Sequence, residues 1–306
     1  MTTTAHQPTL PILPAAAGAV ALVVAPVIAP TTAVAAASCR RAVAALFSAC
    51  LLCLPWVAAS AASADAATLC SAASGATTTP MVELYTSEGC NSCPPADRWL
   101  SQLAREPQPA ATALAFHVDY WDYLGWRDRF ASAQYTRRQR QRVAAQGKRV
   151  VYTPQVMING ADSRAWRYPA QIASSIAAAA SQPAQARLEM QLAAANDGWV
   201  LRLQGLATRP AADMEAWLAM YEDGLVSEVR AGENRGETLR HDRVVRRLFG
   251  PFPLGSDGRI AAEAAISAAD AAVARRGGFT AFVQRRRGGV VQSLNLTVCA
   301  AAGQSS

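Results

Sequence analysis

The stretch VELYTSEGCNSCPPAD, Val82 to Asp97, decides the fold, because it sets two cysteines between an apolar run and a proline pair. The run Met81–Thr86 is short and apolar, which is typical of a buried strand. Cys90 and Cys93 follow it with two residues between them. A pair with this spacing can be a redox dithiol, half of a metal site or a structural bridge.

The prolines after the cysteines predict where the next helix begins. Pro94 and Pro95 would each remove a backbone hydrogen bond deep in a helix, but the amides of the first turn have no partner in any case. The helix is therefore expected to begin near Ser92 as N-cap. An exposed Cys90 just outside it would have a thiol pKa lowered from about 8.5 by the helix dipole. Cys90 is then the attacking sulfur, and the more covered Cys93 the resolving one.

Residues 81 to 182 alternate strand and helix patterns, which predicts an α/β unit with helices covering a sheet. Asn159-Gly160 is expected to be a turn, and Gly147 to end a helix. The expected strands are Met81–Thr86, Thr112–Val118 and Gln155–Ile158, and the expected helices end at Glu106, near Gln146 and before Pro183.

From about residue 185 apolar and polar residues alternate, which predicts strands. Hairpins are expected at Asp197-Gly198 and around Gly288-Gly289, and one helix over roughly Ile260–Arg276. We therefore expect an α/β domain with a helical insert over residues 65–184 and a mainly β C-terminal domain, a small sandwich, over residues 185–306.

Residues 1–64 have the features of a leader with a signal peptide. Arg40 and Arg41 precede the apolar run AVAALFSACLLCLPWVAAS, and the small residues Ala62-Ser63-Ala64 form an A-x-A cleavage site. A membrane anchor is disfavoured because the run is short and broken by Pro55; twin-arginine export and lipidation at Cys50 stay open as alternatives. The expected protein is periplasmic or secreted, with no stable membrane insertion after cleavage.

Removal of this leader leaves four of the seven cysteines. Cys70, Cys90, Cys93 and Cys299 are an even number in an oxidising compartment, and four cysteines allow three pairings. The most economical pairing joins Cys90 to Cys93, and leaves Cys70 and Cys299 as a structural disulfide between the two ends of the exported chain.

The charge does not indicate a nucleic-acid partner. The net charge is +7 and, without Arg40 and Arg41, becomes +5. Arginines cluster at 137–149, 240–247 and 285–287, but no aromatic ladder or nucleic-acid motif accompanies them. We interpret these clusters as solvated faces, and we expect no cofactor.

Three segments, CNSCPPAD, HVDYWDYLGW and TPQVMING, resemble a bacterial family of exported thioredoxin-like proteins catalogued as domain of unknown function 1223. The resemblance extends over nearly the whole exported chain and implies a thioredoxin-like fold. It matches Cys90 and Cys93 to a redox pair, and Pro154 to a proline whose cis peptide faces that pair. Glu83 and Asp119 are both candidates for the buried acid that assists proton transfer.

Several other residues keep two interpretations. His117 is expected to be a hydrogen-bonded core residue rather than a ligand. The aromatic side chains of the insert either line a peptide groove above the dithiol or close the core beneath it; they are Tyr120, Trp121, Tyr123 and Trp126. Residues 232–236 are expected to form a charged turn, and His241-Asp242 has no nucleophile at a recognisable spacing.

These observations favour an exported thiol–disulfide oxidoreductase that acts on protein thiols or disulfides through a Cys-Asn-Ser-Cys dithiol. One alternative is a module that holds a soft metal such as Cu(I), or zinc with help from His117. Another is a non-catalytic interaction protein with an inert Cys90–Cys93 disulfide. The residues do not distinguish a reductant from an oxidant or an isomerase.

Overall fold

The computed structural model describes residues 68–106, 111–208 and 212–299. The predicted leader, with its cleavage site and its three cysteines, lies outside the described residues. All of the described residues belong to one contact unit, residues 62–306.

The described strands are β1 Thr68–Ala73, β2 Met81–Thr86, β3 Thr112–His117, β4 Gln155–Ile158, β5 Ala161–Asp162, β6 Ala186–Ala195, β7 Gly198–Ala207, β8 Met214–Glu222, β9 Leu225–Glu228, β10 Thr238–His241, β11 Val244–Pro253, β12 Arg259–Ile266, β13 Gly277–Arg285 and β14 Val290–Thr297. The helices are α1 Pro94–Ala104, α2 Ala133–Ala145, α3 Pro169–Ala180 and α4 Ala268–Ala274, with short 3₁₀ turns η1 Asp122–Leu124 and η2 Arg164–Arg167.

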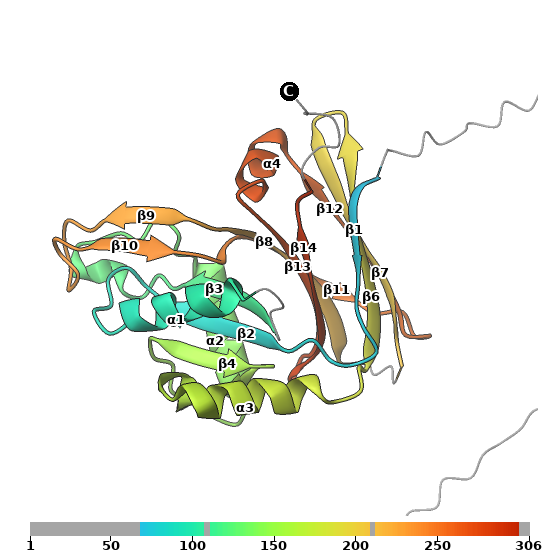
Figure 1. Ribbon diagram of the computed structural model, residues 1–306, viewed down its shortest axis with the longest axis horizontal. Coiled ribbons are helices and arrows are strands. Elements are labelled where there is room, and N and C mark those ends of the chain that lie inside the picture. The colour runs from blue at the N-terminus through green and yellow to red at the C-terminus, as the bar shows by residue number, and fades with distance from the viewer. Residues whose placement is uncertain (1–67, 107–110, 209–211, 300–306) are drawn as a thin grey trace, which may run out of the picture. The chain divides into compact units, whose positions relative to one another are not determined.

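An eight-stranded sheet in the order β14-β13-β8-β11-β3-β2-β4-β5 is the central layer (Figure 1). Strand β2 pairs parallel with β3 and antiparallel with β4. Strand β11 joins the two halves, since it pairs antiparallel with β8 and parallel with β3. The sheet therefore crosses the boundary expected between residues 184 and 185, and both expected domains share one set of hydrogen-bonded strands.

Helices cover both faces of the β3-β2-β4 part, which confirms the expected mixed α/β class. Alternate residues of β2 face opposite sides, and every residue of the strand is buried. On one side Val82 and Leu84 pack against α1 and α3, through Leu100 and Ile172 among others. On the other side the strand packs against α2. None of the helices among the described residues is long and apolar enough to cross a bilayer.

A second sheet, in the order β1-β6-β7-β12, packs against the β8-β13-β14 part of the large sheet. Their shared core is a sandwich of alternating apolar residues, among them Met190, Leu201, Leu218 and Phe279. The hairpin expected at Asp197-Gly198 joins β6 to β7, and the one expected at Gly288-Gly289 joins β13 to β14. The turn expected at Asn159-Gly160 joins β4 to β5.

The prediction of a helix over Ile260–Arg276 is wrong for the first half of that segment. Residues 259–266 form strand β12, and only Ala268–Ala274 is helical. Alternate residues of β12 are buried, which is a period of two. Alanine fills half of this segment and has the highest helix propensity, so that the composition favours a helix and only Ile260 and Ile266 mark the alternation. Pairing with β7 decides the outcome.

Gly277 gives a direct test of the packing between β13 and β8. A Cβ at this position would lie 2.2 Å from the carbonyl oxygen of Tyr221, which is backbone and cannot move aside. We expect Gly277→Ala to lower the free energy of unfolding by more than about 2 kcal/mol. Gly75→Ala is the matched control, because no atom lies within 4 Å of its added Cβ. Equal midpoints of urea unfolding for both variants would contradict this packing.

Candidate functional site

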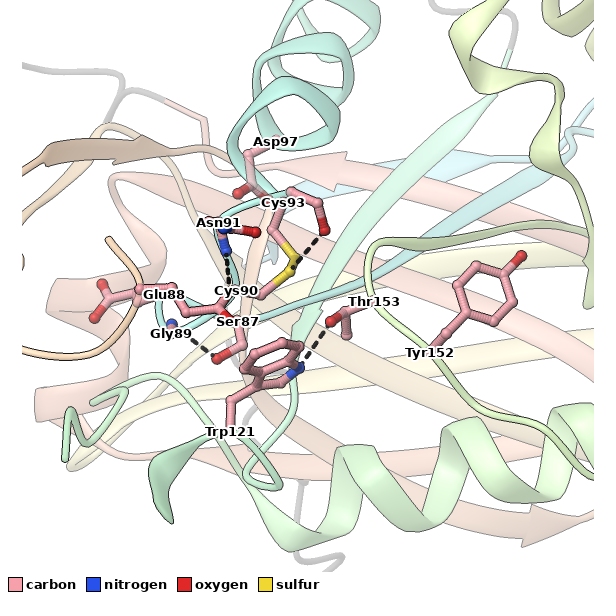
Figure 2. Close-up of a disulfide and its surroundings, with 12 residues drawn as sticks. Ser87, Glu88, Gly89, Cys90, Asn91, Cys93, Asp97, Trp121, Tyr152 and Thr153 are labelled. Atoms are coloured by element: carbon pink, nitrogen blue, oxygen red, sulfur yellow. Dashed lines mark hydrogen bonds between the residues drawn. A yellow bond between two sulfur atoms is a disulfide. The ribbon is translucent and has the colours of Figure 1, made fainter. Parts of the chain in front are cut away.

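The two cysteines of the quoted stretch form a disulfide in a tight turn between β2 and α1 (Figure 2). Their Cα atoms lie 5.5 Å apart. The amide of Cys93 donates to the carbonyl of Cys90 at 3.1 Å, and the amide of Cys90 donates to that of Ser87 at 3.2 Å. Asn91 and Ser92 are exposed at the tip of the turn, whereas both cysteines are 0% exposed.

The helix begins one residue later than the sequence predicts. The N-cap of α1 is Cys93, which makes no side-chain cap bond, and Pro94 and Pro95 take the first helical positions. Ser92 does not cap the helix, because its hydroxyl oxygen lies 3.4 Å from the sulfur of Cys90. The amides of Ala96 and Asp97 donate to the carbonyl of Cys93 at 2.8 and 3.1 Å.

The prediction that Cys90 is exposed is wrong. A loop that is distant in the sequence contacts the turn that holds the two cysteines. Residues 229–237, here called the hairpin loop, connect β9 to β10, and this ribbon runs beside α1 (Figure 1). The side-chain amide of Asn234 donates to the carbonyls of Glu88 and Cys90 at 2.8 and 3.0 Å. The carboxylate of Glu233 accepts from the amide of Asn91 at 3.1 Å. The charged turn expected at residues 232–236 is thus bound to the dithiol turn.

Two glycines allow this close approach. Gly232 has a φ of +74°, and a Cβ there would lie 3.4 Å from Cβ of Trp126 and 3.9 Å from Cα of Gly89. At Gly89 a Cβ would lie 3.2 Å from Cβ of Trp121. Larger residues at either position would separate the hairpin loop, the aromatic insert and the dithiol turn.

The aromatic side chains of the insert were expected either to line a peptide groove or to close the core, and they do not all behave alike. The indole of Trp121 donates to the hydroxyl of Thr153 at 2.8 Å, next to the cis Thr153–Pro154 peptide that precedes β4 (Figure 2). The indole of Trp126 donates to Glu88 at 2.8 Å. Tyr123, by contrast, is 80% exposed. Trp126 is thus bound to the dithiol turn, and Trp121 to the segment before β4. Tyr120, Trp121 and Trp126 are half-buried, and Tyr123 is the most exposed of the four.

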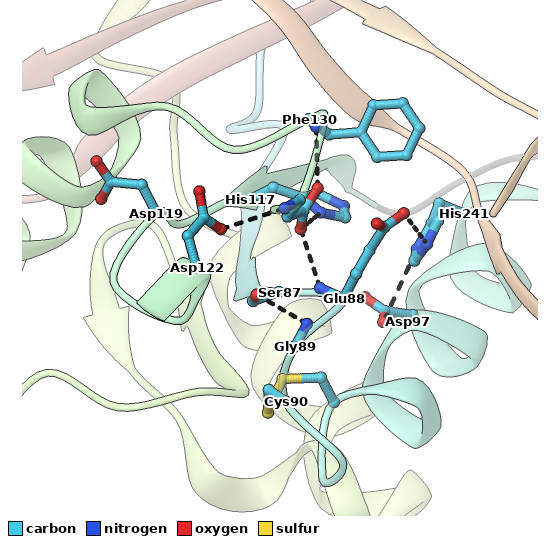
Figure 3. Close-up of polar contacts among 12 residues, drawn as sticks. Ser87, Glu88, Gly89, Cys90, Asp97, His117, Asp119, Asp122, Phe130 and His241 are labelled. Carbon is cyan, nitrogen blue, oxygen red and sulfur yellow. Dashed lines mark hydrogen bonds and ion pairs between the residues drawn. A yellow bond between two sulfur atoms is a disulfide. The ribbon is translucent and has the colours of Figure 1, made fainter. Parts of the chain in front are cut away.

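A buried cluster of ionisable side chains lies beside this turn (Figure 3). Nδ1 of His117 lies 2.6 Å from a carboxylate oxygen of Asp128. The same oxygen accepts from the amide of Glu88 at 2.9 Å, and the other accepts from the amide of Phe130 at 2.9 Å. The cluster comprises Glu88, Asp97, His117, Asp128 and His241, all of them buried.

His241 completes the cluster from the end of β10. Its Nε2 lies 3.4 Å from an oxygen of Glu88, and its Nδ1 lies 3.9 Å from an oxygen of Asp97. Its ring meets the ring of His117 edge to face, with centroids 5.0 Å apart. Four parts of the chain thus supply the cluster: the turn after β2, helix α1, the segment from the end of β3 into the insert, and the end of β10.

Burial and pairing shift the pKa values of these groups in opposite directions. Burial raises the pKa of Asp97. Burial would also raise the pKa of Asp128, but the charge and hydrogen bond of His117 outweigh it and lower that pKa. Burial opposes the charged form of His117, and Asp128 raises its pKa nonetheless. For Glu88, burial is outweighed chiefly by the nearby imidazole of His241, whose Nε2 lies 3.4 Å from one carboxylate oxygen, so that the pKa of Glu88 is lowered.

The two acids proposed from the sequence lie elsewhere. Glu83 faces α2, where one oxygen accepts from Nε of Arg138 at 2.7 Å and from the hydroxyl of Tyr85 at 3.0 Å. Asp119 accepts from the hydroxyl of Thr136 at 2.5 Å. Neither contacts the cluster. Glu88 and Asp97 stand inside the quoted stretch on either side of the cysteines, and this position is the one indication that the sequence offers for them.

The remaining cysteines are also joined. Cys70 in β1 forms a disulfide with Cys299, which follows β14, with Cα atoms 5.8 Å apart. The amide of Cys299 donates to the sulfur of Cys70 at 2.8 Å. Across residues 68–106, 111–208 and 212–299, no group of three or more histidine, cysteine or acidic side chains has a metal-binding arrangement.

Fold and site together define a mixed α/β protein with a buried Cys-x-x-Cys disulfide and an adjoining cluster of histidines and carboxylates. The chain belongs to the family described as protein of unknown function (DUF1223), which matches residues 81–284. No curated protein matches it.

Two solved structures are similar in fold. Protein AGR_C_4864 from Agrobacterium tumefaciens is 23% identical with a TM-score of 0.56, and the match covers 76% of this chain and 100% of that one. HBP35 of Porphyromonas gingivalis is 12% identical with a TM-score of 0.54, and the match covers 76% of this chain and 79% of that one.

The His117–Asp128 pair predicts a pH dependence of stability. The raised pKa of His117 stabilises the fold below about pH 6.5, and this contribution is lost as pH rises through the raised value. The lowered pKa of Asp128 stabilises the fold above about pH 3.9, and this contribution is lost as pH falls through the lowered value.

We expect His117→Gln to lower the free energy of unfolding by about 3 kcal/mol near pH 6, because Asp128 is left buried without its partner. The difference from wild type should shrink as pH rises above about 6.5. Urea unfolding of both proteins from pH 5 to 9 measures it. A difference that stays constant over this range would contradict a charged pair.

Proposed function

We propose that this protein is an exported thiol–disulfide oxidoreductase whose reactive pair is Cys90 and Cys93. The observation that carries the proposal is the Cys-x-x-Cys disulfide at the first turn of α1, with buried acids and imidazoles beside it. The positive end of the helix dipole favours a thiolate at this position. Export to the periplasm or the exterior rests on the predicted leader and agrees with a disulfide chemistry.

A thioredoxin-like arrangement of residues 81–180 supports the same proposal. Strand β2, helix α1 and parallel strand β3 are followed by the antiparallel pair β4 and β5 and then by α3. Helices α1 and α3 share one face of the sheet. Pro154 precedes β4 on the side of the dithiol turn, as judged by the bond between Trp121 and Thr153. Pro154 would there help to bind an extended substrate.

The proposed exchange proceeds through a mixed disulfide. The Cys90 thiolate attacks a substrate disulfide, forms a new sulfur–sulfur bond and releases one substrate thiolate. Cys93 then loses its proton and attacks the Cys90 sulfur, which restores the Cys90–Cys93 bond and releases the second substrate thiolate. In the opposite direction two substrate thiols are oxidised and the pair is reduced. Protein thiols or disulfides are the proposed substrates.

Glu88 and Asp97 are better placed than Glu83 or Asp119 to exchange protons with this pair. Glu88 is two residues before Cys90, and Asp97 lies one helical turn after Cys93. A carboxyl whose pKa is raised by burial, as at Asp97, holds a proton at higher pH than a free carboxyl does and is therefore better suited to act as an acid or base.

Burial of both sulfurs requires that the site open before it reacts. A thiolate must be reachable to attack a protein disulfide. The hairpin loop is held to the dithiol turn by the side chains of Asn234 and Glu233. We infer that the loop moves away in the reactive state, as local openings of low free energy allow.

The same burial favours one competing function, an interaction protein with an inert disulfide. That function predicts a Cys90–Cys93 reduction potential below about −300 mV, the range of structural disulfides. A soft-metal module has less support, since only two thiols are at hand and Nδ1 of His117 is engaged by Asp128.

Replacement of Cys93 tests the exchange. We expect Cys93→Ala to accumulate mixed disulfides through Cys90, because the resolving sulfur is gone. Non-reducing electrophoresis and mass spectrometry after incubation with an unfolded disulfide-containing protein detect them. Cys90→Ala is the matched control and should form none. If neither variant forms an adduct and the intact protein exchanges no thiols with glutathione, the proposed function is wrong.

Replacement of Asn234 tests the opening. Two hydrogen bonds at about 1 kcal/mol each hold the loop, so Asn234→Ala should raise the open population roughly tenfold to thirtyfold. The rate at which iodoacetamide alkylates Cys90 in the reduced protein reports this population.

Asn91→Ala is the control for this experiment. Asn91 has an exposed side chain and contacts the loop through its backbone amide alone. It should leave the alkylation rate within about twofold of wild type. Equal rates in all three proteins would show that the loop does not limit access.

A further inference from the structure

The imidazole of His241 lies between the two acids that flank the dithiol in the sequence. Nε2 faces Glu88 at 3.4 Å and Nδ1 faces Asp97 at 3.9 Å (Figure 3). Both ring nitrogens are buried and without a hydrogen-bond partner. Since an imidazole can donate from one nitrogen and accept at the other, it can carry a proton between groups on its two sides.

The chemistry of the dithiol creates a need for such a carrier. Reduction of a disulfide to two thiols takes up two electrons and two protons, and oxidation releases them. Cys90 and Cys93 are 0% exposed, so water does not reach the sulfurs in the closed state. In the opened site the bound substrate takes the place of the hairpin loop over the sulfurs, so the proton of Cys93 has to pass through side chains that the fold has buried.

We propose that His241 is a positioning residue of the dithiol, which holds Glu88 and Asp97 in register and passes a proton between them during thiol–disulfide exchange. The proposal rests on the proposed function and extends it to a residue that lies far from the cysteines in the sequence. The imidazole spans the space between the carboxylates of Glu88 and Asp97.

In the resolving step each bond that forms is matched by a bond that breaks, and each proton has an acceptor. The Cys93 thiol gives its proton to the carboxylate of Asp97, and its sulfur attacks Cys90 in the mixed disulfide. The Cys90–substrate bond breaks, and the electron pair leaves with the substrate sulfur. His241 gives its Nε2 proton to Glu88 and takes the proton of Asp97 at Nδ1, which returns Asp97 to its basic form. No further oxidant or reductant is required.

Groups from every neighbouring segment face this imidazole. Glu88 lies in the turn after β2, Asp97 on α1, and His117 at the end of β3 with its partner Asp128. Phe130 contacts the rings of both histidines, with its centroid 5.8 Å from that of His241.

Charged groups at the margin of the cluster are bound elsewhere. The guanidinium carbons of Arg129 and Arg246 lie 4.7 and 5.3 Å from the centroid of Phe130. Asp242, the residue after His241 and just beyond the end of β10, accepts from Arg105 and from the amide of Gly224. His241 therefore faces two carboxylates, those of Glu88 and Asp97, and one further imidazole, an arrangement that suits proton exchange.

His241→Gln tests the proposal, because glutamine keeps hydrogen-bonding atoms but cannot carry a proton near neutrality. The readout is the rate at which the mixed disulfide between Cys90 and glutathione resolves, from pH 5 to 9. We expect the variant to resolve roughly tenfold to a hundredfold more slowly near pH 7, and to approach wild type near pH 9, above the ordinary thiol pKa of about 8.5. Asp242→Asn, next to His241 in the sequence but outside the cluster, should follow the wild-type profile.

The outcomes separate the two proposals. If wild type forms no mixed disulfide with glutathione, the proposed function fails and this inference with it. If wild type resolves the adduct and His241→Gln has the same pH profile, only the role of His241 is overturned. Should His241→Gln lack a cooperative urea transition, Asp97→Asn replaces it: the same slowing near pH 7 supports the route, and an unchanged profile overturns it.

Discussion

Burial of Glu88 is the constraint on which the dithiol region depends. Every polar group of this residue is engaged by a different part of the chain. Its amide donates to Asp128, its carbonyl accepts from Asn234, and its carboxylate accepts from Trp126 and faces His241. A buried carboxylate without such partners would cost several kcal/mol. The insert, the hairpin loop and the end of β10 are therefore held together around one residue of the quoted stretch.

The register of the large sheet brings His241 to this place. Strand β11 pairs with β3 through Val244 and Ala115. Val244 follows His241 by three residues, and Ala115 precedes His117 by two, so this one pair sets the two imidazoles side by side. The strands after residue 185 are thus part of the candidate site itself. A unit cut at residue 184 would lose Asn234, His241 and half of the large sheet.

Local patterns in the sequence predicted local structure well, and contacts between distant segments poorly. The apolar run before the cysteines and the two prolines after them located β2 and α1 within a residue, because these features act on their own backbone. Strand β12 was missed because its alanines favour a helix, and pairing with β7 overrides that preference. The expected exposure of Cys90 failed for a similar reason, since Asn234 comes from a loop whose position depends on the pairing of β9 with β10. Nothing in the sequence near Glu88 points to His241.

The cluster beside the disulfide also bears on whether that disulfide is inert. A bond that only braces a turn needs apolar packing around it, and apolar residues in place of a buried ion pair are often neutral or stabilising. Here five ionisable side chains are buried instead, and both nitrogens of His241 lack a hydrogen-bond partner. Such an arrangement lowers the stability of the fold relative to an apolar core. The lower stability is explained if protons enter and leave the dithiol through these groups. An inert disulfide gives no reason for burying them.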